Sequence, residues 1–169
     1  MTEYGPTITS TAGVRWRFAA AAVAALAVAT VVSTRGQGPQ TPRGGGRGAR
    51  AVITVKVSHP VEEGEVACAL FASAAGFPDA ASKSRGVVHP AHGAATTCTF
   101  GGVAPGTYAV AVLLDTNRNG RADTNFLGMP TEPWGVSNDA RPLMRAPNFD
   151  EASFSVAAGA KLTVAVELK

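Results

Sequence analysis

The sequence predicts an all-β domain, an antiparallel β-sandwich of about seven strands, and three observations lead to that prediction. After residue 51, apolar residues recur at every second position in several short stretches, which is the period of a half-buried strand. Glycine and proline separate these stretches, and none of them shows the 3.6-residue period of a helix. Short alternating segments joined by such turns are typical of two packed antiparallel sheets.

The first 50 residues are expected to lie outside this domain. Arg15 and Arg17 precede an uncharged run over residues 18–32, which is the order of a secretory signal. Residues 1–32 are therefore predicted to be an n-region and a signal helix. This helix is either cleaved near Ala29 or kept as an anchor over residues 18–32, a short span against the roughly 20 residues that cross a membrane. Residues 33–50, rich in Gly, Pro and Arg, are predicted to be a disordered linker, and residues 51–169 the sandwich.

The charge distribution excludes one class of partner. Six arginines and one acid precede residue 51, whereas nine Lys or Arg and eleven Asp or Glu follow it, so the domain has a net charge of −2 (9 − 11). The basic balance therefore belongs to the leader and linker, and no nucleic-acid partner is expected. We expect an exported monomer (periplasmic, cell-surface or secreted) that contacts a membrane only through an uncleaved N-terminal segment.

The first half of the domain is expected to contain four strands. Residues 51–58 alternate, with Ile53, Val55 and Val57 facing a core. Residues 65–73 are apolar on both faces, which predicts a central strand or one covered on both sides. A short strand is expected near residues 86–89, and another over residues 95–100.

The second half starts with a predicted turn at residues 101–106, in which Pro105 and Gly106 suit the central positions of a type II turn. Residues 107–114 form the clearest strand and lead directly into Asp115. Residues 125–149 carry many turn-forming residues and little periodicity, so we expect them to be functional or held by another part of the protein. Strands are predicted over residues 152–157, with Phe154 and Val156 inward, and over residues 161–169.

The loop after that clearest strand predicts a calcium site. Its sequence, DTNRNGRAD at residues 115–123, places oxygen ligands at every second position around Gly120, as in looped calcium sites. The predicted ligands are two carboxylates, two amides and the backbone carbonyl of position 121, in the order Asp115, Asn117, Asn119, Arg121 and Asp123. Position 12 is Phe126 rather than glutamate and no helix flanks the loop, so this is not an EF-hand. An Asx-rich turn is the alternative.

Glu132 is the predicted source of a further carboxylate for the ion. It lies in the irregular stretch that follows the loop, and such a contact would hold that stretch in place. Asp139 is the other acid there that could serve. The same region supports an alternative function, a hydrolase with metal-bound water near Asp115, Asp123 and Glu132, although no histidine lies in this region.

The two cysteines, Cys68 and Cys98, both lie in predicted strands. An exported protein enters an oxidising compartment, which favours a disulfide. Such a bond would close a loop of about 30 residues and contribute about 3 kcal/mol in the chain-entropy model. Two buried thiols in neighbouring core positions are the alternative.

Four segments together resemble the DUF2141 family of bacterial exported proteins: APGTYAV at 104–110, DTNRNGRAD at 115–123, GMPTEPWGVSN at 128–138 and APNFDEASF at 146–154. The family patterns D-x-N-x-N-G-x-x-D and G-x-P-x-E-x-x-G-x-S-N are both intact, so Glu132, Ser137 and Asn138 occupy matching positions. The resemblance covers residues 51–169 and implies export and a transthyretin-like or immunoglobulin-like sandwich. It implies no activity.

These features favour a non-enzymatic, exported module of the cell envelope with a calcium-stabilised loop. Trp134, Ser137 and Asn138 are the candidate ligand surface for an envelope or extracellular partner. A small satellite core over the loop is the alternative role for Trp134. An interaction module tethered by an uncleaved N-terminal helix is a third hypothesis.

Overall fold

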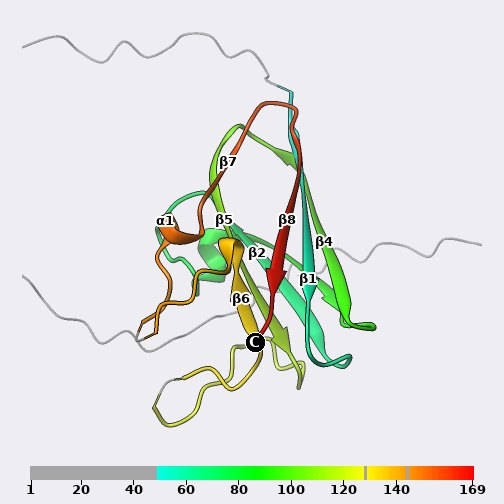
Figure 1. The fold of residues 1–169 in the computed structure, drawn as a ribbon, viewed down its shortest axis with the longest axis vertical. Helices are drawn as coiled ribbons and strands as arrows, with labels where there is room; N and C mark the ends of the chain where they lie inside the picture. Colours follow the sequence, from blue (N-terminus) through cyan, green and yellow to red (C-terminus); the bar gives the residue numbers. More distant parts are fainter. Residues whose placement is uncertain (1–48, 128, 144) are drawn as a thin grey trace, which may run out of the picture.

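A computed structural model describes residues 49–169 with the exception of residues 128 and 144. Two β-sheets pack face to face, as Figure 1 shows, and the predicted all-β sandwich is confirmed. The predicted signal segment, residues 1–32, and nearly all of the linker, residues 33–50, lie outside the described residues. Within the described part of the chain, no helix is long and apolar enough to cross a membrane.

The smaller sheet has three strands in the order β4–β1–β8. They are β1 (Ala51–Ser58), β4 (Ala95–Val103) and β8 (Lys161–Glu167). Alternate residues of β1, among them Ile53, Val55 and Val57, are buried as predicted. β1 pairs with β4 in antiparallel and with β8 in parallel orientation. The parallel pair departs from the antiparallel prediction, and it is possible because β8 returns to β1 only after the chain has built the other sheet.

The larger sheet has the order β3–β2–β5–β6, and β7 also pairs with β5. Its strands are β2 (Glu65–Phe71), β3 (Ser84–Pro90), β5 (Gly106–Asp115), β6 (Trp134–Val136) and β7 (Phe154–Val156). β2 and β5 are buried on both faces. One face lies in the core between the sheets, and loops cover the other, where Phe77, Phe149 and Trp134 pack. This arrangement confirms the expectation drawn from the two apolar faces of residues 65–73.

Three short helical segments were not expected from the sequence: η1 (Ala81–Lys83), η2 (Ser137–Asp139) and α1 (Phe149–Ala152). Ala152 ends α1, so the strand predicted over residues 152–157 is shorter and comprises β7 alone. The physical reason is the cap at the start of α1, where the Glu151 carboxylate accepts from the Asn148 N–H at 2.8 Å.

The turn predicted at residues 101–106 is also corrected. β4 continues through Gly101 and Gly102 to Val103, and its register with β1 shifts between the pairs Ile53–Phe100 and Ala51–Val103. Gly102, rather than Gly106, has the positive φ, at 69°. An extra residue with a left-handed glycine is a β-bulge. The glycines therefore bend β4 instead of forming a type II turn.

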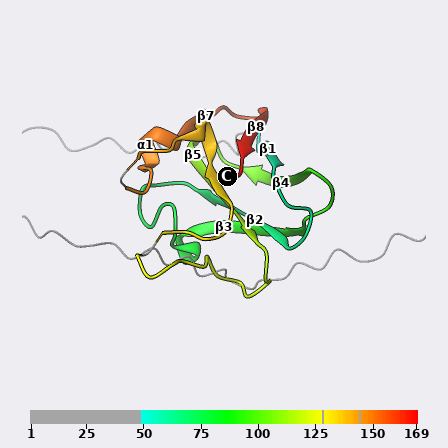
Figure 2. The same cartoon turned by 60° about the horizontal axis from the view of Figure 1, so that its bottom comes forward.

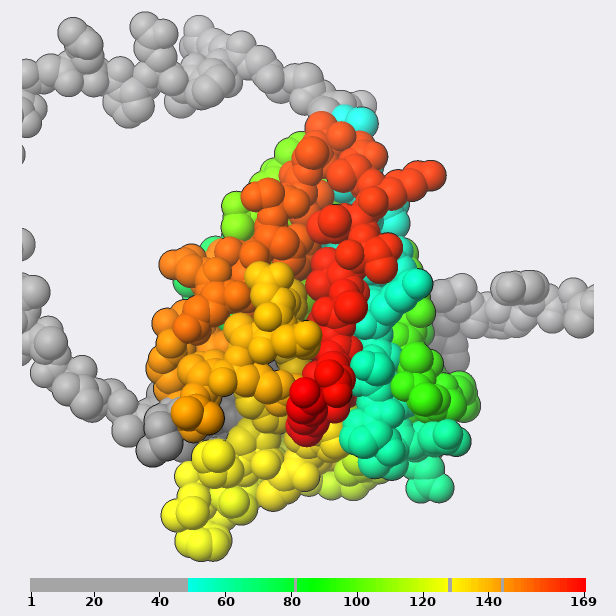
Figure 3. All heavy atoms as spheres, viewed as in Figure 1, coloured from blue at the N-terminus to red at the C-terminus, as the bar shows by residue number. Residues whose placement is uncertain are grey.

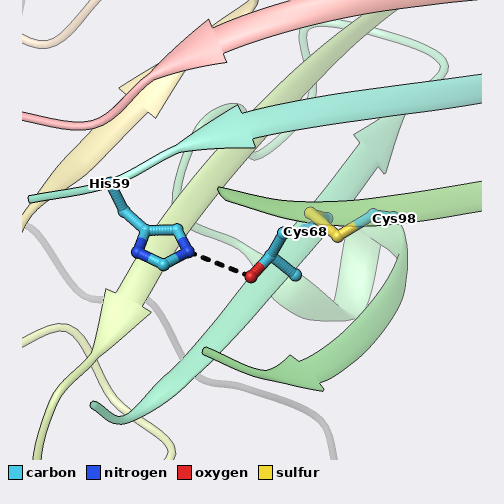
Figure 4. The surroundings of a disulfide bond; sticks show 4 residues. His59, Cys68 and Cys98 are labelled. Carbon is cyan, nitrogen blue, oxygen red and sulfur yellow. Dashed lines mark hydrogen bonds between the residues drawn. A yellow bond between two sulfur atoms is a disulfide. The ribbon is translucent and has the colours of Figure 1, made fainter. Parts of the chain in front are cut away.

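A disulfide joins Cys68 and Cys98, as the sequence favoured (Figure 4). Cys68 lies on β2 and Cys98 on β4, so the bond links the two sheets through the core. Close by, the buried His59 ring donates from Nδ1 to the Val61 carbonyl oxygen at 2.6 Å and accepts at Nε2 from the Thr96 hydroxyl at 3.0 Å. Both polar atoms of this ring are therefore satisfied inside the sandwich.

Candidate functional site

β5 delivers Asp115 to one end of the sandwich, which Figure 2 turns toward the viewer. Asp115 is 3% exposed and pairs across the sheet with Glu65, the first residue of β2. The turn before β2 packs against the same point, because a Cβ on Gly64 would lie 2.5 Å from the Asp115 carbonyl oxygen. Gly64 also has a φ of 106°, so glycine is required there. The start of the loop is thus fixed by both sheet pairing and close packing.

The loop folds around its own side chains. The Asp115 carboxylate accepts from the N–H of Asn119 at 3.1 Å (Oδ1) and from the N–H of Gly120 at 2.6 Å (Oδ2). The amide oxygens of Asn117 and Asn119 accept from the N–H groups two residues later, at 3.1 and 2.8 Å. These are the Asx turns weighed as the alternative to a metal site. Each accepting oxygen has two lone pairs, so each can still face a cation.

The oxygen-bearing side chains of the loop also converge on one another. Asn117 donates from Nδ2 to Asp123 Oδ2 at 2.6 Å, and Asn119 donates from Nδ2 to Asp123 Oδ1 at 3.0 Å. The structure therefore brings together Asp123 and both amides named from the sequence, whereas Arg121 is exposed with its N–H held by Asn119.

Glu132 closes the loop from outside. Its side chain is 6% exposed. Oε1 accepts from both the N–H and the hydroxyl of Thr116, at 2.8 and 3.0 Å, and Oε2 accepts from the N–H of Asp123 at 3.1 Å. In the described part of the chain, no three His, Cys, Asp or Glu side chains form a group that could hold a metal. The three hydrogen bonds place Glu132 as a clamp on the two ends of the loop. Nothing in the sequence pointed to Thr116 as its partner.

Ser137 does not lie on a surface, which corrects its place among the candidate ligand residues. It is fully buried. β5 pairs with β6 over residues 111–113 and with β7 over residues 106–108. Between these two pairings, the Val110 N–H donates to the Ser137 hydroxyl at 2.9 Å, and that hydroxyl donates to the Ala152 carbonyl at 2.5 Å. Ser137 thus fills the gap in the ladder between the two short strands.

Replacing Ser137 with alanine is expected to lower the free energy of unfolding by about 1 to 2 kcal/mol, because the buried Val110 N–H loses its acceptor. Urea unfolding of the two proteins measures the difference. Ser155→Ala is the matched control, since Ser155 is exposed on β7. Equal effects of the two substitutions would contradict the assigned role of Ser137.

The other two candidate ligand residues, Asn138 and Trp134, are held by contacts with neighbouring segments. Asn138 is exposed, has a φ of 61°, and donates from Nδ2 to the carbonyl oxygens of Ser153 and Glu151 at 2.9 and 3.3 Å. Trp134 is half-buried, and the Arg141 guanidinium lies 5.1 Å from the centre of its ring. Arg141 also donates to the Trp134 carbonyl oxygen at 2.7 Å. These contacts fasten the irregular segment to its neighbours, and Trp134 packs over Ala67 and Leu113 as a small satellite core.

One carboxylate near this segment is strongly perturbed. Glu151 accepts two bonds from the Arg145 guanidinium, at 2.6 and 2.8 Å, and one from the Asn148 N–H at 2.8 Å. The Arg145 hydrogen bonds and then the Asn148 bond lower the pKa of Glu151 to about 2. Glu151 therefore stays ionised at all but strongly acidic pH and maintains the cap of α1.

A family model described as "Uncharacterized protein conserved in bacteria (DUF2141)" matches residues 55–164, from within β1 to within β8. The chain belongs to the DUF2141 family. The resemblance noted in the sequence is thereby confirmed, and the match contains the loop, Glu132 and Ser137. No curated protein and no solved structure matches the chain. The DUF2141 description carries no activity.

Proposed function

We propose that this DUF2141 domain is a non-enzymatic, exported module of the cell envelope whose 115–123 loop binds Ca²⁺ as a structural ion. The observation that carries the proposal is the convergence of Asn117 and Asn119 on the Asp123 carboxylate, at 2.6 and 3.0 Å. In these two contacts, amide N–H groups donate to the carboxylate from the side on which a cation would bind it.

The donor set suits calcium chemically. The loop offers carboxylates from Asp115 and Asp123, amides from Asn117 and Asn119, and the carbonyl of Arg121, and all of these are hard oxygen ligands. Calcium takes six to eight oxygens, so water completes the shell. Because the set has only two carboxylates and no bidentate glutamate, we expect a dissociation constant of about 10⁻⁴ to 10⁻³ M, as in extracellular modules. The bound ion would offset the two negative charges and hold the loop in one conformation.

The contacts of Glu132 support a structural role over the hydrolase alternative. A general base must reach a water or a substrate proton. Both Glu132 oxygens instead accept from the backbone at Thr116 and Asp123, and the side chain is buried. Glu132, the acid best placed for a hydrolytic step, therefore has both carboxylate oxygens hydrogen-bonded to the loop.

The disulfide supports export. Such bonds persist in oxidising compartments and are rare in the cytosol, and the Cys68–Cys98 bond links the two sheets of the domain. The arginine-flanked apolar run of residues 18–32 points the same way. Residues 18–32 can also provide a membrane anchor if the signal is not cleaved.

Calcium titration followed by thermal unfolding tests the site. With Ca²⁺ at ten times its dissociation constant, mass action is expected to stabilise the fold by about 1.4 kcal/mol. For a domain of this size, that shift raises the melting temperature by about 5 to 6 °C. Asp123→Asn should remove most of the rise, because it takes away one of the two carboxylates while keeping the side-chain shape.

Asp139→Asn is the matched control. Asp139 is an exposed acid outside the loop that accepts from the Glu167 N–H at 3.4 Å, so the calcium response of this variant should match that of the parent protein. An unchanged melting temperature in millimolar Ca²⁺ would refute calcium binding. A response of equal size to Mg²⁺, or one that survives Asp123→Asn, would place the ion elsewhere.

A further inference from the structure

The 115–123 loop contains an asparagine followed directly by a glycine. Of the five asparagines in the chain, only Asn119 precedes glycine. This dipeptide is especially prone to deamidation, because the next backbone nitrogen attacks the side-chain amide and glycine has no Cβ to obstruct it. Asn119 is exposed, and a Cβ on Gly120 would meet nothing within 4 Å beyond its chain neighbours. In Figure 3, the yellow segment that includes the loop forms the lower end of the molecule.

The reaction needs only water. The Gly120 nitrogen loses its proton and bonds to the side-chain carbon (Cγ) of Asn119, and the amide nitrogen leaves as ammonia. Water then opens the resulting succinimide ring at either bond between its nitrogen and a carbonyl carbon. One opening gives aspartate. The other gives isoaspartate, in which the chain continues through Cγ and the backbone path is longer by one atom. The net change consumes water, releases ammonia and involves no oxidant or reductant.

The hydrogen bonds of the folded loop oppose this reaction. The Gly120 N–H donates to Oδ2 of the buried Asp115 at 2.6 Å. Because Cγ must take the place of that proton on the nitrogen, the Asp115 bond blocks the attack. The Asn119 side chain is engaged at both ends, since Oδ1 accepts from the Arg121 N–H at 2.8 Å and Nδ2 donates to Asp123 Oδ1 at 3.0 Å. Deamidation therefore requires the loop to open.

Charge at this end of the sandwich favours opening when no cation is bound. Three carboxylates meet at the loop, those of Asp115 and Asp123 within it and that of Glu132 against its ends. Glu65 lies directly opposite Asp115 on β2, and like charges in that position are destabilising. The two arginines of the loop form no ion pair within the described residues. A calcium ion would offset the negative charge and add ligand bonds that exist only in the closed loop.

We propose that Asn119 is a site of spontaneous deamidation through the Gly120 nitrogen, and that calcium bound by the loop suppresses it. The second part rests on the proposed function, whereas the first does not. Both products carry a carboxylate in place of the amide that donates to Asp123, so repulsion replaces a hydrogen bond. Isoaspartate also changes the spacing between Asp115 and Asp123. A loop left without calcium would thus lose its closed form irreversibly.

Peptide mapping of the incubated full chain tests the proposal. The protein is held in mildly alkaline buffer with EDTA or with millimolar Ca²⁺, and mass spectrometry follows the conversion of each asparagine. Asn125 is the internal control, because it is exposed in the same part of the chain but precedes Phe126. In EDTA, Asn119 is expected to convert several-fold faster than Asn125. In Ca²⁺, the rate at Asn119 should fall several-fold, while the rate at Asn125 should stay the same.

The two parts of the proposal fail separately. Equal rates at Asn119 and Asn125 in EDTA would overturn the deamidation site. Equal rates at Asn119 in EDTA and in Ca²⁺ would overturn the suppression. In that case, a melting temperature that still rises with Ca²⁺ would leave calcium binding intact, whereas an unchanged melting temperature would refute it as well. Asp123→Asn should abolish the effect of Ca²⁺ on the rate at Asn119, because it removes a calcium ligand.

Glu132→Gln tests in EDTA whether closure of the loop protects Asn119. Glu132 holds both ends of the loop, so this variant is expected to raise the rate at Asn119 several-fold relative to the rate at Asn125. The ratio of the two rates is the readout, since global unfolding would raise both. Glu63→Gln, at an exposed acid outside the loop, should leave the ratio unchanged. An unchanged ratio in Glu132→Gln would overturn the protective role of loop closure.

Discussion

Glu132→Gln is expected to lower the free energy of unfolding by about 2 to 3 kcal/mol, because it removes charge-assisted bonds from a buried position. Glutamine has one accepting oxygen, and glutamate uses both of its oxygens here, for Thr116 and Asp123. Whichever way the amide points, its NH₂ group faces a backbone N–H. One end of the loop therefore loses its attachment while the shape of the side chain is kept.

The measurement is urea unfolding in EDTA, so that bound metal makes no contribution. Amide hydrogen exchange adds a local readout, since the protons of Thr116 and Asp123 should exchange faster in the variant. Glu63→Gln is the control, because Glu63 is an exposed acid in the turn between β1 and β2. Unchanged exchange at both Thr116 and Asp123 would show that Glu132 does not clamp the loop.

Removing the disulfide is expected to lower the free energy of unfolding by about 3 to 4 kcal/mol, the chain-entropy value for a loop of this length. The bond spans 30 residues and joins β2 to β4. Its loss therefore frees the unfolded chain and also removes the one covalent link between the sheets in the described residues. Comparing the oxidised protein with its reduced form measures the effect without changing the sequence.

The double variant Cys68→Ala with Cys98→Ala controls for the reductant. Its stability should be the same with and without reductant, and it should lie close to that of the reduced protein. Mass spectrometry of protein isolated after export should find both thiols oxidised. Free thiols in that protein, or equal stability of its oxidised and reduced forms, would contradict a stabilising disulfide.

Three strands could be predicted from alternation alone: β1, β4 and β8 each bury one face, so they show the period of two. β2 and β5 are buried on both faces and were predictable as continuous apolar runs bounded by turns. The missed strand, β6, has three residues, too few to show any period. The parallel pairing of β1 with β8 was also missed, because alternation specifies which face is buried and says nothing about which strand lies alongside.

The conformation of glycine and the burial of short polar residues depend on tertiary context. Pro105 and Gly106 are typical of a turn in isolation. In the structure, β1 continues to pair with β4 past Phe100, and the left-handed glycine is Gly102, in a β-bulge. Ser137 looks like a surface residue within a polar stretch. Its burial depends on β6 and β7 ending on either side of Val110, a gap that exists only once the sheet is assembled.

The sequence by itself determined the all-β class, the disulfide partners and the spacing of oxygen-bearing side chains in the 115–123 loop. The first follows from the local period of two, the second from a chain with two cysteines, and the third from residue order. It also singled out Glu132 as the distant carboxylate that meets the loop. The tertiary structure decided what Glu132 touches and which residues satisfy the edge of β5. Those outcomes depend on hydrogen bonds and packing between segments far apart in the chain, such as the contact of Ser137 with Val110, 27 residues away.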